Sequence, residues 1–241
     1  LGFFGAGLSG ALLAQFYIPI FWHMAGFLGV TSAMIILLLA HYRPATQRLN
    51  DRANTAIFAY PTKPILTLVA LTLSAMLLEG AGTDWSVIFM RDIFSTPPFI
   101  SGMAFALGAL SQFIVRFFAD RFVDQYGPEK ITSYSVIALG IGVILVTFAP
   151  LPLIALGGFV LLGAGNAVIF PLAISAAAQR TDRPASVNVA AVAQLSFIVF
   201  LLAPPFLGIM AEQFGIRSAF GICFPLVILS WFSVKSLRAP Q

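Results

Sequence analysis

Long apolar segments separated by short polar breaks run through the whole chain. A membrane-spanning α-helix needs about 20 mostly apolar residues. The pattern predicts eight such helices, at residues 1–17, 21–41, 64–90, 98–122, 129–149, 152–178, 185–210 and 216–237. The fold class expected from this pattern is therefore an all-α, multi-pass membrane protein embedded in a lipid bilayer.

Composition strengthens this interpretation and excludes several functions. Charged residues make up only 9% of the chain and hydrophobic residues 59%, whereas a soluble domain carries about 25% charged residues. The net charge of +4 is explained by basic loops, so no nucleic-acid partner is expected. The sequence lacks a Walker-type phosphate loop, a G-x-S-x-G elbow and paired metal ligands. We therefore expect no enzyme activity, no cofactor and no metal.

The distribution of basic residues predicts the orientation. If residues 42–63 are cytoplasmic, alternation places ten Lys and Arg residues inside and two outside, as the positive-inside rule requires. The C-terminus is then cytoplasmic, and the expected location is the inner membrane of the cell. The inner set is Arg43, Arg48, Arg52, Lys63, Arg121, Lys130, Arg180, Arg183, Lys235 and Arg238, and the outer set is Arg91 and Arg217.

The longest polar break, residues 42–63, separates two predicted spans from six. In a protein built from six-helix halves, this break is where the halves join. Residues 1–41 would then be the last two helices of the N-terminal half, and residues 64–241 the complete C-terminal half. The first apolar run is already under way at Leu1, so we expect the sequence to be a fragment of a longer protein that is monomeric when complete.

Several motifs resemble those of the major facilitator superfamily. The stretch RFFADRFVDQYGPEKI, residues 116–131, resembles its inner-loop signature, with Asp120 and Arg121 at the Asp-Arg pair. GAGNAVIFP resembles the tenth helix of that superfamily, and APPFLGIMAEQFGIRSAF the eleventh. DWS and MRD in the third span are similar to the seventh helix of the fucose-permease-like and related uncharacterised bacterial branch. Val115, Arg116, Gln125 and Glu129 depart from the usual pattern of the signature.

The resemblance implies a cytoplasmic gate. Asp120 would approach the positive N-terminus of the seventh span and help to close the inner face, an interaction typically worth 0.3–1 kcal/mol or more. Arg121 would belong to the same gate. Arg116, near the inner end of the fourth span, could extend its charged head to the membrane surface. The alternative is that Asp120 and Arg121 form only a solvated loop pair.

Two carboxylates, Glu79 and Asp84, interrupt the third apolar span. At 1.5 Å per residue, Glu79 lies roughly 22 Å from the inner end of its helix, within the hydrocarbon layer. A charge there costs about 2.5–3.5 kcal/mol on insertion scales, so Glu79 should face a cavity, a partner or the bundle interior. It could carry a coupling proton, bind a solute or brace a neighbouring helix. Asp84 is expected nearer the outer interface, paired with Arg91.

Three amides, Gln112, Asn166 and Gln194, fall in the middle third of the bilayer by the same helical rise. Buried amides need partners. Together with Glu79 and Asp84 they are the candidate residues for substrate binding or proton coupling. The alternative for each amide is a hydrogen bond that joins two helices.

The function expected from these features is secondary active transport of a small polar solute by alternating access. The driving ion would be a proton carried by Glu79, and the solute either a sugar-like compound or an exported drug. The competing interpretation is a membrane sensor or scaffold that has a degenerate transporter fold and moves no solute.

Overall fold

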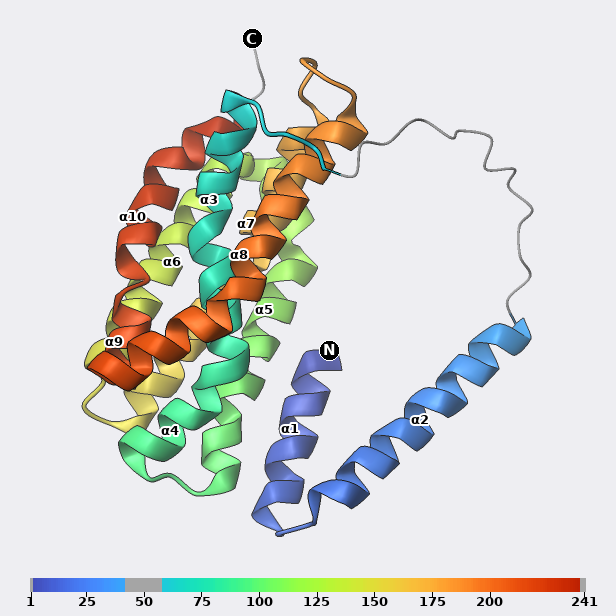
Figure 1. Ribbon diagram of the computed structural model, residues 1–241, viewed down its shortest axis with the longest axis vertical. Coiled ribbons are helices and arrows are strands. Elements are labelled where there is room, and N and C mark those ends of the chain that lie inside the picture. The colour runs from blue at the N-terminus through green and yellow to red at the C-terminus, as the bar shows by residue number, and fades with distance from the viewer. Residues whose placement is uncertain (1, 42–57, 239–241) are drawn as a thin grey trace.

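The computed structural model describes residues 2–41 and 58–238, which contain helices and no strand (Figure 1). The helices are α1 (Gly2–Gln15), α2 (Ile20–His41), α3 (Lys63–Gly80), α4 (Ser86–Phe94), α5 (Pro98–Tyr126), α6 (Pro128–Phe148), α7 (Pro152–Ala178), α8 (Ala185–Phe214), α9 (Ile216–Gly221) and α10 (Phe224–Ser233). A π-helical turn (Ala81–Trp85) joins α3 to α4, and a 3₁₀ turn (Val234–Leu237) follows α10.

The prediction of an all-α, multi-pass membrane protein is confirmed. Within the described ranges, seven helical segments are long and apolar enough to cross a membrane. Two of them are composite, since Lys63–Phe94 contains α3, the π turn and α4, and Ile216–Leu237 contains α9 and α10. The eighth expected span, residues 1–17, contains α1, whose 14 helical residues fall short of the roughly 20 needed.

Helices α3 to α10 pack into one bundle, in which α7 contacts α3, α4, α5, α6 and α8, and α3 contacts α7, α8 and α10. Its core is aliphatic in the middle and aromatic toward one end. There, the rings of Phe89, Phe159 and Phe220 meet edge to face, with centroids 5.4–5.7 Å apart. Each ring comes from a different helix, so this cluster joins α4, α7 and α9 in the geometry that aromatic pairs prefer.

Glycine allows α5 and α7 to approach closely. A Cβ atom added to Gly163 would lie 2.0 Å from the carbonyl oxygen of Gly108, so no other residue fits there. Ser111, three residues after Gly108, donates a hydrogen bond of 2.7 Å to the carbonyl of Val160. Small residues and hydroxyl groups are the usual means by which membrane helices pack closely.

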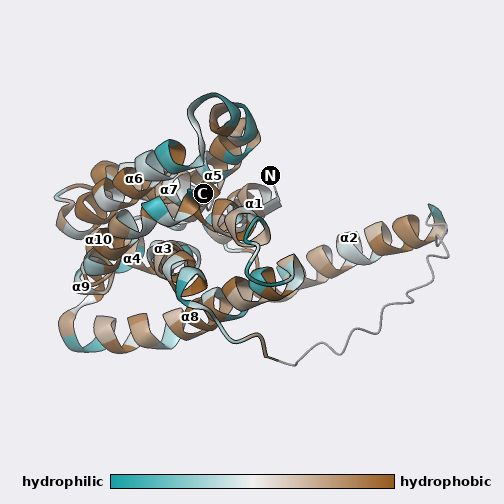
Figure 2. Ribbon diagram, turned by 90° about the horizontal axis from the view of Figure 1, so that it is seen from above, coloured by the Kyte–Doolittle hydropathy of each residue, from teal (hydrophilic) through white to brown (hydrophobic). Residues whose placement is uncertain are grey.

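The first two helices differ from this bundle. Helix α1 packs along α5, where Ala11 is buried against Gly102. Helix α2 extends away from the bundle and has no buried residue (Figures 1 and 2). Figure 2 shows that α2 is hydrophobic along most of its length. A helix that is apolar on every side suits lipid or other helices as neighbours.

The start of α3, the α5–α6 and α7–α8 connections and the end of the 3₁₀ turn all lie at one end of the bundle (Figure 1). We call this the basic end, because most of the described Lys and Arg residues lie there. Its polar contacts join segments that are distant in sequence: Arg183 to the carbonyl of Tyr60 (2.8 Å), Arg180 to the carbonyl of Ser236 (2.8 Å), and Arg238 to Glu129 (2.7 Å).

This arrangement agrees with one side of the membrane collecting positive charge. The orientation itself stays a prediction. Residues 42–57 of the predicted linker, with Arg43, Arg48 and Arg52, lie outside the described residues.

Candidate functional site

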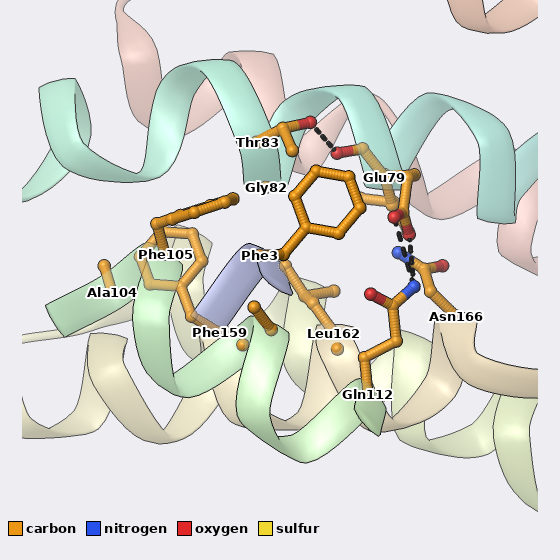
Figure 3. A pocket seen from close by; sticks show the side chains of 14 residues that line it. Phe3, Glu79, Gly82, Thr83, Ala104, Phe105, Gln112, Phe159, Leu162 and Asn166 are labelled. Atoms are coloured by element: carbon orange, nitrogen blue, oxygen red, sulfur yellow. Dashed lines mark hydrogen bonds between the residues drawn. The ribbon is translucent and has the colours of Figure 1, made fainter. Parts of the chain in front are cut away.

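Glu79 lies at the last turn of α3, partly buried between helices, where its carboxylate is held by an amide (Figure 3). The side chain of Gln112, on α5, donates from Nε2 to both carboxylate oxygens, at 3.1 and 2.9 Å. Helix α5 packs against α4 and the π turn that continue α3, and this packing places Gln112 opposite Glu79. Two of the predicted polar residues are therefore brought together.

Asn166, on α7, is the third member of this group. Its side chain faces the same space, next to Glu79 and Gln112 (Figure 3). Only 6% of the residue is exposed, and its Oδ1 atom has no hydrogen-bond partner among the described residues. A buried carbonyl oxygen without a partner is costly unless water reaches it.

The space between these three side chains is a small pocket of about 40 Å³. Thr83 and apolar residues form the remaining walls, and the apolar ones include Leu162 and Phe159 of α7, Phe105 of α5 and Phe3 of α1 (Figure 3). A water molecule needs about 10–15 Å³ measured in this way, whereas drug-sized ligands occupy clefts of roughly 300–1,000 Å³. The pocket therefore has room for a few waters beside a carboxylate, but not for a solute.

The backbone changes its winding directly after Glu79. Residues Ala81–Trp85 form a π-helical turn, and the hydroxyl of Thr83 donates to the carbonyl of Glu79. Such turns are rare and often occur at functional sites. Nothing in the sequence analysis indicated this turn; the only local signal is the pair Gly80 and Gly82, in a helix that otherwise lacks glycine.

Arg116 was expected to reach the inner membrane surface as part of the gate. Instead, it lies one turn beyond Gln112 on α5, and its Nε donates a hydrogen bond of 3.0 Å to the carbonyl of Ala167 on α7. Its charge is close enough to act on Glu79. Arg116 therefore lies near the Glu79 pocket without lining it, and the residue is exposed on α5.

The expected pair between Asp84 and Arg91 is wrong. Asp84 lies in the π turn, is exposed, and does not line the pocket. Arg91 binds its neighbour Asp92 instead, with Nε 2.6 Å from Oδ1. The adjacent carboxylate is reached without any rearrangement of the helix, whereas Asp84 lies seven residues earlier, in the irregular turn before α4.

Gln194 also lies elsewhere. Its Oε1 accepts a hydrogen bond of 3.0 Å from the backbone N–H of Ala59, in the segment that precedes α3. It is not among the residues that line the Glu79 pocket. Gln194 therefore joins α8 to the non-helical segment before α3.

Asp120 and Arg121 do not lie in a loop. Helix α5 continues to Tyr126, so both residues are exposed on its surface. Within the ranges that the structure describes, neither side chain forms a hydrogen bond or an ion pair. The helix is longer than the apolar pattern indicated because RFFADRFVDQY contains no helix-breaking residue before Gly127.

A different carboxylate lies at the start of α8. Asp182 accepts hydrogen bonds from Asn188 (2.9 Å) in the first turn of α8 and from Thr62 (3.1 Å) before α3. The hydrogen bond from Asn188, followed by that from Thr62, lowers the pKa of Asp182 below its usual value. The position expected for Asp120 is thus taken by Asp182. The signal available in the sequence was an Asp two residues before Pro184, at a helix start.

Comparison with known proteins identifies the family. The sequence model of the Major Facilitator Superfamily matches residues 1–196 and, a second time, residues 67–240. The chain belongs to this superfamily. An uncharacterised MFS-type transporter of Yersinia pestis is 28% identical over 229 residues, which cover 95% of this chain and 58% of the relative.

Further relatives agree. The uncharacterised transporter y4wD of Sinorhizobium fredii is 27% identical over 221 residues, 90% of this chain and 57% of its own length. Membrane protein MosC of Rhizobium meliloti is 26% identical over 155 residues, 64% of this chain and 38% of MosC. No solved structure matches the chain. The chain spans a little over half the length of the first two relatives.

Proposed function

We propose that the protein is a secondary active transporter that works by alternating access and couples solute movement to protons through Glu79. The observation that carries this proposal is a carboxylate in the apolar interior of a bundle from this superfamily, held by Gln112 and lying beside a water-sized space. Neither of the two ion pairs between described residues involves Glu79.

The surroundings of Glu79 suit a group that gains and loses a proton. An ionised carboxylate in an apolar site is expensive, and the neutral form relieves that cost. The primary amide of Gln112 is both a donor and an acceptor. It can therefore donate to Glu79 when the carboxylate is ionised and, after rotation of the amide group, accept from Glu79 when it is protonated. Water in the pocket, bound to the Oδ1 atom of Asn166, would connect Glu79 to the solvent when one side opens.

In this proposal the solute is small and polar, a sugar-like compound or an exported drug. Transporters of this architecture bind solutes near the bilayer midplane between repeated units. The pocket is too small for such a solute by itself, so the solute would lie against it on the side where Phe3 of α1 closes it. The proposed location is the inner membrane, with a cytoplasmic C-terminus and a monomeric complete protein.

The test is transport by the complete protein in proteoliposomes, screened across solute classes with and without a pH gradient. Glu79→Gln keeps the shape of the side chain but cannot carry the proton. For a solute that the wild type accumulates, Glu79→Gln should retain exchange down a concentration gradient and lose accumulation driven by pH. Asp84→Asn is the matched control, since it removes an exposed carboxylate from the same span, and it should behave as wild type.

The other outcomes are also decisive. Normal pH-driven accumulation by a folded Glu79→Gln protein would remove Glu79 from the coupling mechanism. Equal loss of exchange and accumulation would indicate that Glu79 binds the solute. Binding of a solute without its movement across the membrane would favour the alternative, a sensor or scaffold with a transporter fold.

A further inference from the structure

Helix α7 continues through a proline. Pro171 lies inside the helix, which runs from Pro152 to Ala178. Proline has no backbone N–H, so the carbonyl four residues earlier, that of Ala167, loses its usual helical donor. In a membrane-spanning bundle such a freed carbonyl must find another partner, because no bulk water is present.

Arg116 supplies that partner. Its Nε lies 3.0 Å from the Ala167 oxygen and donates to it from the neighbouring helix α5. Arg116 forms no ion pair with any carboxylate in the described part of the chain. The guanidinium therefore takes the place of the missing amide, and α5 is attached to α7 at the point where the proline interrupts the hydrogen bonding of α7.

This contact is one turn away from the Glu79 site. Gln112 and Arg116 are four residues apart on α5, so both lie on the same face of that helix. Gln112 reaches α3 through Glu79, and Arg116 reaches α7 through Ala167. Ala167 immediately follows Asn166, whose side chain lines the pocket.

We propose that Arg116 is a positioning residue: it satisfies the carbonyl freed by Pro171 and thereby holds Asn166 in place beside Glu79. This local role does not depend on the proposed transport function, because it concerns one hydrogen bond and the placement of one side chain. It predicts that Arg116 is needed only while residue 171 is a proline.

A double-mutant cycle tests this dependence. In the complete protein in detergent micelles, Arg116→Met, which has no hydrogen-bond donor, should lower the midpoint of thermal unfolding. Pro171→Ala restores an amide that can bond to the Ala167 carbonyl, so adding Arg116→Met to it should cost less than half as much. Coupled residues give such non-additive effects, whereas independent ones add. Equal costs in the two backgrounds would overturn the proposal.

Hydrogen exchange localises the effect. Loss of one net hydrogen bond should speed amide exchange at the α7 break by about fivefold in Arg116→Met. Exchange around Pro204 and Pro205, a proline break in α8 that Arg116 does not contact, should be unchanged. Equal acceleration at both breaks would mean that Arg116 acts on general stability, and would contradict the proposal.

Placement of residue 166 needs its own readout. Cys223 is the single cysteine of the chain and is buried, so Cys223→Ser with Asn166→Cys gives one reporter thiol at the pocket. Its alkylation by a small maleimide should change severalfold with Arg116→Met and return toward the starting rate with Arg116→Gln, which keeps a donor at the position of the arginine Nε. An unchanged rate would contradict the positioning role. If Arg116→Met does not fold alone, recovery of folded protein by Pro171→Ala would support the proposal, and failure to recover it would oppose it.

Discussion

The polar cluster in the middle of the bundle and the polar contacts at its basic end use the same kinds of side chain in different surroundings. In the middle, Glu79 meets the amide of Gln112 and lies close to Asn166, with apolar walls around them. At the basic end, the side chain of Arg238 is 65% exposed while it binds Glu129. Desolvation makes the few interior contacts matter, while water and salt weaken the exposed ones.

The carboxylates of one span illustrate the same difference. Glu79 and Asp84 are five residues apart, yet only Glu79 enters the interior. The π turn begins two residues after Glu79 and contains Asp84 on the exposed side. The direction of the side chain therefore decides whether a carboxylate lines the pocket. Its depth in the apolar span does not decide this by itself.

The largest effect on stability is expected from the interior contact. Gln112→Leu removes both hydrogen bonds to the Glu79 carboxylate and leaves a buried charge unsatisfied, which should lower the free energy of unfolding by about 3 kcal/mol. Thermal or denaturant unfolding in detergent measures this. The double variant Glu79→Leu with Gln112→Leu should recover most of the loss, because apolar side chains then replace both partners.

Two results would weaken the comparison between the middle and the basic end. One is a Gln112→Leu protein as stable as wild type. The other is a double variant that is less stable than Gln112→Leu alone, which would mean that shape, and not desolvated polarity, dominates at this position.

A smaller and pH-dependent effect is expected at Asp182, which lies outside the membrane-spanning segments. Its pKa is lowered by the hydrogen bond from Asn188, so the folded state favours the ionised form. The resulting stabilisation should be present above about pH 3.9, the usual pKa of an aspartate, and should be lost as the pH falls through the lowered pKa of the folded state. Unfolding midpoints between pH 3 and 7 should therefore converge for wild type and Asp182→Asn at the acid end.

The Asn188→Ala variant sharpens this prediction, because it removes the donor and keeps the carboxylate. It should reduce the same pH-dependent part of the stability, and the double variant should lose little more than either single variant. A constant difference between wild type and Asp182→Asn across the pH range would contradict the role assigned to this hydrogen bond.

The smallest effect is expected from the exposed ion pair at the basic end. Glu129→Gln removes the charge that pairs with Arg238, but both groups face solvent. Its unfolding midpoint at physiological salt should be indistinguishable from that of wild type, and added salt should not change this. A loss comparable to that of Gln112→Leu would show that the two regions do not differ as described.

Much of the fold could be predicted because it depends on local properties of the chain. Runs of apolar residues placed α3 to α10 within a few residues of their positions, although α4, α5 and α8 continue beyond the predicted spans, to Phe94, Tyr126 and Phe214. Helical rise is constant, so the depth of Glu79, Gln112 and Asn166 could be counted along their spans. That count was sufficient to bring these three together as candidates, and they do line one pocket.

What the sequence left open is the direction in which each side chain points and which helix it meets. Membrane helices are apolar on nearly every side, so no polar stripe marks the interior face, and Gln194 at a similar depth binds Ala59 instead. For the same reason, the sequence did not show that Asp182, and not Asp120, lies at the start of α8. Nor did it show that Arg116 binds the carbonyl freed by Pro171. The sequence determined how deep each polar side chain lies along its span, because helical rise is a local property of the backbone. Only the packing of the helices decided which hydrogen-bond partner each side chain has.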